Sequence, residues 1–177
     1  TAPLPPDIEP GQMPSIPEVP REASAVMEFV GGEQAAHSHL AHYLSDPRRP
    51  STYKETRNGL LGADYSTKFS PFLAQGSLSP RRIWQAVSEF EQQVMKNDST
   101  YWIKFELLWR EYFHWWVQDW GAELYRAPEQ YQTRQPWFEA WCDGETGVPF
   151  IDANMKELTQ SGFMSNRGRQ NVASFLA

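Results

Sequence analysis

The sequence predicts an all-α protein, and three observations lead to this prediction. Apolar residues recur at intervals of three and four over several segments, which is the period of an amphipathic helix. Serine–proline pairs and glycines stand where such helices begin and end. No segment shows the strict alternation of apolar and polar residues that a half-buried strand needs. We therefore expect a helical domain that follows a proline-rich linker.

The composition narrows the class of protein. The chain has 177 residues, of which 40% are hydrophobic and 14% aromatic, so it can bury a core and does not fit the disordered class. No apolar run approaches the roughly 20 residues of a membrane helix. A net charge of -6 argues against a surface coated with basic charge, although a local basic patch is compatible with it. We expect a soluble, intracellular protein without a membrane partner, which is cytoplasmic if the source is bacterial.

The expected elements follow one another along the chain. Residues 1–21 are rich in proline and are expected to be extended. Helices are expected between Gly32 and Pro47, from Ser70 to Gly76, from Ser79 to about Met95, from Tyr101 to Trp120, from Asp152 to Gly162, and from Asn166 onwards.

Three details of this order are open to test. The helix from Tyr101 to Trp120 is expected to be the longest and the most buried. Residues 126–147 lack a period and are expected to form a loop with one helical turn near 137–141. Asp152 is expected to cap the helix that follows it.

A first group of polar residues precedes the short helix at Ser70. Ser66, Thr67 and Lys68 lie just before a helix start, where free backbone N–H groups and the helix dipole favour a phosphate. Ordinary helix capping explains the same residues, and the local pattern leaves both explanations open.

A second group lies on the long helix. Glu106 and Arg110 are four residues apart and share a face with Trp102 and Trp109. A carboxylate and a guanidinium beside aromatic rings can hold a base-like ligand by hydrogen bonding and stacking. A surface ion pair beside core aromatic residues is the alternative.

A third group lies at the start of the last helix, and two further groups give weaker evidence for a functional site. Arg167 and Arg169 flank Gly168, which suits phosphate contact or a solvated helix end. The histidines at 37, 39 and 42 fit a plain amphipathic helix better than a metal site, so no metal is expected. Cys142 is the single cysteine, which excludes an internal disulfide, and it has no histidine near it in sequence to activate it.

These groups belong to longer motifs that resemble the photolyase and cryptochrome family. The motifs are Tyr53 with Thr56-Arg57-Asn58, the run from Ser66 to Arg81, Ser99 to Arg110, Trp141 with residues 144–147, Asp152-Ala153, and Met164 to Leu176. The last of them resembles the DASH cryptochromes in particular. The resemblance covers about residues 31–177.

The resemblance implies a helical domain that binds FAD and accepts a pyrimidine dimer flipped out of DNA. The residues it implies for FAD are Tyr53, Ser66, Thr67, Lys68, Phe69, Ser70 and Arg169. Those it implies for DNA are Arg57, Glu106, Trp109, Arg110, Asn166 and Arg167, of which Glu106, Trp109 and Asn166 would touch the lesion.

The implied function is flavin-dependent, blue-light-driven repair of cyclobutane pyrimidine dimers in single-stranded or looped DNA. The alternative is a blue-light photoreceptor, or a DNA- or RNA-binding flavoprotein, without repair activity. Residues 1–30 would be the interdomain linker and 31–177 a partial FAD-binding domain, without the antenna domain, which would hold a chromophore such as a folate, and without the C-terminal part. We expect such a fragment to be inactive alone and to self-associate.

One position departs from the family pattern. The tryptophan that usually stands ten residues before the equivalent of Trp141 is Tyr131 here, and Trp137 is the alternative for electron transfer.

Overall fold

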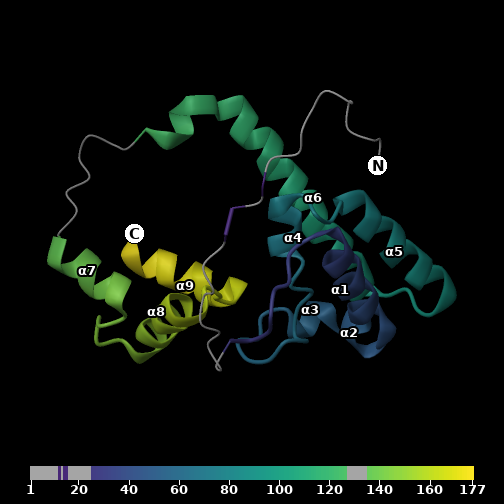
Figure 1. Ribbon diagram of the computed structural model, residues 1–177, viewed down its shortest axis with the longest axis horizontal. Helices are drawn as coiled ribbons and strands as arrows, with labels where there is room; N and C mark the ends of the chain where they lie inside the picture. The colour runs from purple at the N-terminus through teal and green to yellow at the C-terminus, as the bar shows by residue number, and fades with distance from the viewer. Residues whose placement is uncertain (1–11, 13, 16–24, 127–134) are drawn as a thin grey trace.

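The computed structural model describes residues 12, 14–15, 25–126 and 135–177, and this part of the chain is helical without a strand. Figure 1 shows α1 to α5 gathered at one end of the molecule and α7 to α9 at the other. The long helix α6 starts within the first group and extends beyond it. The expected all-α class is therefore confirmed for the described residues.

The first group contains the helices that the sequence predicts and two that it does not. Its helices are α1 (Glu33–Ser45), α2 (Arg48–Ser51), α3 (Tyr53–Thr56), α4 (Ser70–Gln75), α5 (Pro80–Gln93) and α6 (Asp98–Trp120), followed by the 3-10 helix η1 (Gly121–Tyr125). Gly76 ends α4 in the left-handed conformation, as its position predicts. The short helices α2 and α3 were not expected, because their few residues carry no detectable period.

The second group differs from expectation in two places. Its helices are α7 (Gln135–Asp143), α8 (Pro149–Ser161) and α9 (Asn166–Leu176). The prediction of one helical turn near 137–141 is right in its place but wrong in its length, since the helix spans 135–143. The Trp141 indole N–H ties this helix to α9 by donating to Val172 O at 2.9 Å. The prediction that Asp152 caps its helix is wrong too. The helix begins earlier at Pro149, and the Asp152 carboxylate accepts bonds from Thr146 and Gly147.

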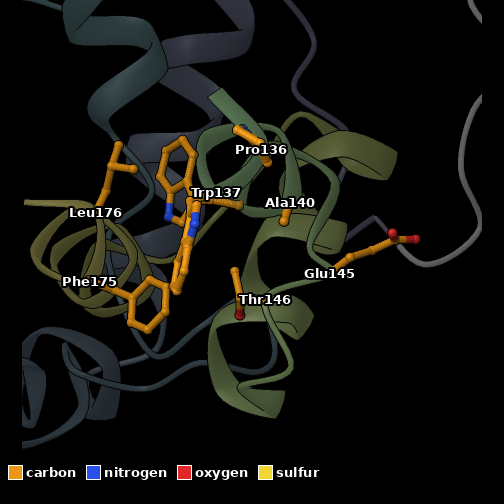
Figure 2. Close-up of a pocket in the computed structure, with 8 residues that line it drawn as sticks. Pro136, Trp137, Ala140, Glu145, Thr146, Phe175 and Leu176 are labelled. Carbon is orange, nitrogen blue, oxygen red and sulfur yellow. The ribbon is translucent and has the colours of Figure 1, made fainter. Parts of the chain in front are cut away.

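A mostly apolar pocket of about 470 Å³ lies between α7 and the end of α9. Figure 2 shows Phe175 and Leu176 from α9 facing Trp137 from α7. None of the residues expected to bind FAD or DNA lines it. Trp137, the alternative residue for electron transfer, is 72% exposed, and Tyr131 lies outside the described residues.

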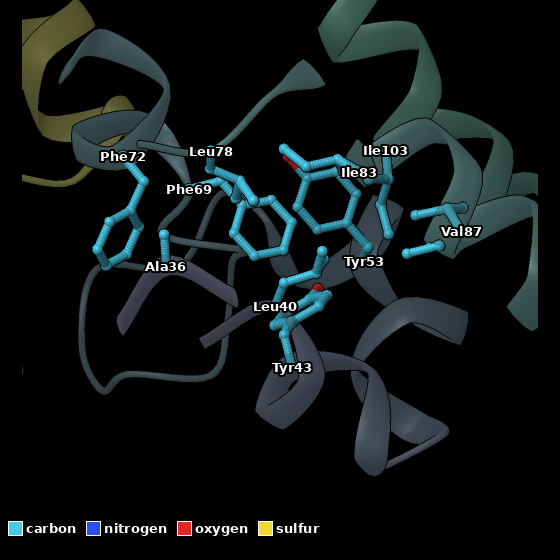
Figure 3. Close-up of a cluster of buried hydrophobic side chains, with 11 residues drawn as sticks. Ala36, Leu40, Tyr43, Tyr53, Phe69, Phe72, Leu78, Ile83, Val87 and Ile103 are labelled. Carbon is cyan, nitrogen blue, oxygen red and sulfur yellow. The ribbon is translucent and has the colours of Figure 1, made fainter. Parts of the chain in front are cut away.

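The main core lies under α1, α3, α4, α5 and the first part of α6. Figure 3 shows its side chains converging from these elements, with Tyr53, Phe69 and Ile83 among them. A smaller core cluster in the second group consists of Ile151, Met155, Met164 and Val172. Phe29 links the two groups, since its ring stacks on Phe163 at 6.0 Å and tilts against Phe72 at 6.4 Å. The end of the segment expected to be a linker is thus packed.

The long helix begins at Asp98, three residues before its expected start, and it is not the most buried. Asn97 caps it by accepting from Thr100 N at 3.0 Å, and the Thr100 hydroxyl accepts from Asn97 N in return. Its buried residues are confined to its first two turns. Further along, four rings that share one side of the helix are between 43% and 54% exposed; these are Trp109, Tyr112, Phe113 and Trp120, named here the aromatic face of α6. An apolar period predicts a helix face that packs against other residues. Among the described residues, no element packs over the aromatic face of α6.

Candidate functional site

The short helix α3 is fixed against the first turn of α6 by polar contacts. The Ser99 hydroxyl accepts from Lys54 N at 3.0 Å and donates to Glu55 Oε2 at 2.8 Å. The Lys54 ammonium pairs with Asp98 at 3.0 Å. Arg57 is the C-cap residue of α3, so these contacts place it beside α6.

Arg57 and Glu106 form an ion pair with 2.7 Å between Nη1 and Oε1. The Trp102 indole N–H donates to the same oxygen at 3.1 Å, and the Arg57 guanidinium lies 5.3 Å from the centre of the Trp102 ring. The sequence spacing left an ion pair of Glu106 with Arg110 as the alternative to ligand binding, but Glu106 pairs with Arg57, which is 49 residues away along the chain. Trp102, expected only to flank the site, joins both partners.

Trp109 and Arg110 lie on the next turn of α6 and are exposed to solvent. The Trp109 ring is 43% exposed, and it contacts Phe105, Tyr112 and Phe113 at centroid distances of 5.6 to 5.9 Å. Trp102, Glu106 and Trp109 are spaced at four and three residues, so they follow one face of the helix. The structure therefore offers a carboxylate and an accessible ring side by side.

The segment before α4 is held by a histidine. The His39 Nε2–H donates to Thr67 O at 2.8 Å, and the His39 ring packs against Phe69 and Phe72. Burial lowers the pKa of His39 and outweighs the bond to Thr67 O, which acts in the opposite direction, so the neutral ring is favoured. The amphipathic pattern alone places His39 on a plain helix face, and no local signal in the sequence links it to Thr67.

Lys68 is a buried cation with an unusual backbone. Its φ of 53° lies in the left-handed region, and it is the one non-glycine residue there among those described. Its ammonium donates to the Ser66 hydroxyl at 2.9 Å and lies 3.2 Å from the centre of the Tyr65 ring. Burial lowers the pKa of Lys68 to about 8, against the opposing effect of Asp64 and Glu157. A buried ammonium beside a hydroxyl is suited to bind an anion.

The start of α9 reaches the same side of the molecule as α3. Ser165 caps α9 by accepting from Gly168 N at 2.9 Å, and the Arg167 guanidinium donates to Asn58 Oδ1 at 2.7 Å. Because Asn58 follows Arg57, this contact brings Arg167 near the ion pair of Arg57. Asn166 is exposed at the first position of α9. Arg169 is two residues from Arg167, so it lies on another side of the helix, and its Nε donates to Met164 O.

The expected residues thus fall into two kinds. Arg57, Glu106, Trp109, Arg110, Asn166 and Arg167 are exposed or half-buried, whereas Tyr53, Lys68 and Phe69 are buried, at 8%, 6% and 3% exposed. Burial raises the pKa of Tyr53, and the nearby charge of Glu106 raises it further. Ser66 and Thr67 are half-buried, while Ser70 and Arg169 are exposed.

Two other features are absent from the described part of the chain. It holds no group of three His, Cys, Asp or Glu side chains that could bind a metal ion. None of its helices combines the length and the apolar character required to cross a membrane.

Known proteins resemble this chain over most of its length. Its residues 102–177 match the FAD binding domain of DNA photolyase. Cryptochrome DASH of Natronomonas pharaonis is 47% identical over all of this chain, and Cryptochrome DASH of Synechocystis is 50% identical over 91% of it. The chain spans 40% of the length of the first relative and 34% of the second.

Solved structures give the same result. The crystal structure of the Synechocystis cryptochrome superposes with a TM-score of 0.86 at 50% identity, over 90% of this chain and 34% of that one. A class III photolyase from Agrobacterium tumefaciens superposes with a TM-score of 0.65 at 31% identity, over 82% of this chain and 30% of that one. Fold and sequence therefore agree that FAD is the cofactor of this domain. The chain belongs to the photolyase and cryptochrome family, is similar to its DASH cryptochromes, and carries part of the helical FAD-binding domain.

Proposed function

We propose that the protein repairs cyclobutane pyrimidine dimers under blue light and that its DNA substrate is single-stranded or looped. The observation that carries this proposal is the Glu106 carboxylate, held by Arg57 and Trp102 through one oxygen and placed beside the exposed ring of Trp109. Lesion repair requires a site that recognises a base edge and a base plane together.

The chemistry of a pyrimidine matches these two groups. A thymine carries an N–H donor between two carbonyl acceptors on the edge that pairs in the duplex. The Glu106 carboxylate would accept from that N–H, and the Trp109 ring would pack against the dimer. Arg57, Arg110 and Arg167 would contact phosphates on either side, and the Asn166 amide would bind a base or the backbone.

Among the residues expected at FAD, the surroundings of Lys68 fit a phosphate group of the cofactor. The buried Lys68 ammonium has a hydroxyl and a ring as neighbours, so a phosphate would offset the cost of its burial. Ser66, Thr67 and Ser70 would add hydroxyl contacts, and Arg169 would approach from α9. Tyr53 and Phe69 lie in the core and would support this surface from beneath.

The chemistry that bound FAD supplies is transfer of one electron to the dimer under blue light, followed by return of that electron. The residues of this chain do the rest. They hold the cofactor phosphates, orient the flipped bases and keep the charge of Glu106 at a fixed position.

The test compares two variants of the full-length flavoprotein on oligonucleotides that contain one dimer. Glu106→Gln should lower repair about tenfold or more, since hydrogen bonds to charged groups contribute about 1.5–3 kcal/mol. The control Glu111→Gln changes an exposed carboxylate on another side of the same helix and should repair normally. Flavin absorbance should be equal in all three proteins.

The same assay addresses the alternative function. A wild-type protein that binds FAD and DNA but leaves dimers intact under blue light would refute repair and support a photoreceptor or a nucleic-acid-binding flavoprotein. Single-stranded, looped and duplex substrates are compared side by side. Equal repair of all three would refute the preference for unpaired DNA.

A further inference from the structure

Trp102 contacts both members of the ion pair at the proposed lesion site. Its indole N–H donates to Glu106 Oε1 at 3.1 Å. Its ring face lies 5.3 Å from the Arg57 guanidinium carbon and 5.1 Å from the Lys54 ammonium, within the range of cation–π contact. One side chain therefore fixes both the anion and the cation of the pair.

The two bonds to Glu106 reach the same oxygen. Arg57 Nη1 and Trp102 Nε1 both donate to Oε1, while Oε2 accepts no hydrogen bond from the described part of the chain. Glu106 is 36% exposed, so a ligand can approach the second oxygen. This is the oxygen that the proposed function requires for the N–H of the lesion.

The indole N–H also opposes a competing arrangement. Arginine and a carboxylate prefer a bidentate contact, in which two guanidinium N–H groups bind the two oxygens. That contact would occupy Oε2 of Glu106. A second donor on Oε1 that comes from Trp102, one turn earlier on the same helix, holds the carboxylate in the single-oxygen contact instead.

We propose that Trp102 is a positioning residue that keeps Glu106 Oε2 open for an N–H donor of the substrate and thereby sets the preference for a pyrimidine dimer. This inference rests on the proposed function, because it assumes that Glu106 binds the lesion. It assigns to Trp102 a role that its place among core aromatic residues does not predict.

The experiment measures binding of the full-length flavoprotein to an oligonucleotide with a dimer and to the same oligonucleotide without one. Trp102→Phe keeps a ring for the cations but lacks the N–H. It should lower the preference for the dimer about tenfold, as expected for a lost hydrogen bond to a charged group. The control is Trp84→Phe, because Trp84 also lies under a lysine, Lys104 at 5.2 Å, but on α5.

Two further measurements separate positioning from a general structural effect. A dimer methylated at the pyrimidine N3 lacks the N–H, so it should bind wild type and Trp102→Phe with nearly equal affinity. Arg57→Lys cannot form the bidentate contact, so the Trp102→Phe substitution should cost less preference in that background than in wild type. A purely structural role would instead weaken binding of both oligonucleotides and lower flavin content.

The outcomes are distinguishable. A wild-type protein without preference for the dimer refutes the proposed function and this inference with it. A wild-type preference that Trp102→Phe retains as fully as Trp84→Phe refutes the inference alone. If Trp102→Phe does not fold, benzothienylalanine is placed at position 102, because it keeps the bicyclic shape without the N–H. This variant should show the same loss of preference for the dimer.

Discussion

Replacing Lys104 by methionine should destabilise the domain strongly, because Lys104 is half of a buried ion pair. Its ammonium lies 2.6 Å from Glu91 Oε2, and the two side chains are only 10% and 9% exposed. Removing one partner of such a pair typically costs about 3–5 kcal/mol, because the other charge stays buried. The Thr100 hydroxyl still donates to Glu91 at 2.9 Å, so the lower end, about 3 kcal/mol, is expected.

The size of this effect can be measured by urea unfolding and by thermal unfolding, both followed by circular dichroism at fixed protein concentration. About 3 kcal/mol corresponds to a fall in Tm of roughly 6–12 °C for a chain of this size. Adding Glu91→Leu to Lys104→Met removes both charges and should recover most of the loss. The control Lys54→Met breaks an exposed pair with Asp98 and should cost no more than about 1 kcal/mol.

Two results would refute this reasoning. The first is a loss of less than about 1 kcal/mol in Lys104→Met, which would equal the effect of a surface pair. The second is a double variant that is less stable than the single one. Either would mean that water reaches this contact and that packing of α5 on α6 does not depend on it.

Four more predictions follow from features of the site and its support. Gly168→Ala should cost about 1–3 kcal/mol of unfolding free energy, because a Cβ there collides with the buried Asn154 side chain; Gly31→Ala, with open space around it, is the control. Burial lowers the pKa of Lys68 to about 8 from an ordinary 10.5, so unfolding free energy should rise as pH increases between these values, and Lys68→Met should abolish that rise. Trp109→Ala should weaken dimer binding by roughly 1–3 kcal/mol in a titration of the full-length protein while its flavin absorbance stays unchanged. The isolated 177-residue chain should self-associate through the aromatic face of α6, so light scattering should give a mass above 20.4 kDa; a monomer would contradict this.

Local signals predicted two of the helix ends correctly. Gly76 and Gly162 end α4 and α8 in the left-handed conformation, at the positions that the sequence predicts. These features depend on residues within one turn of each other, so the sequence contains them in full.

The features that sequence reasoning missed depend on contacts between distant segments. The short helix α3 is held by Ser99, and α7 is held by the bond from Trp141 to α9. Glu106 pairs with Arg57 although the helical spacing favoured Arg110. No local period records such partners, and only the resemblance to a family placed Arg57 and Glu106 in one site.

The ring of Phe29 between Phe72 and Phe163 has a consequence for cooperativity. Within the described residues the two core clusters share no side chain. The contacts that join the two groups include the Phe29 ring, the Lys68 ammonium over the Phe163 ring at 5.5 Å and the bond from Arg167 to Asn58. Regions joined in this way can unfold as separate units, which amide hydrogen exchange detects as two levels of protection. A cofactor that touches Ser66 on one unit and Arg169 on the other would join them into one, so flavin loading should raise the protection of α8 toward that of α5.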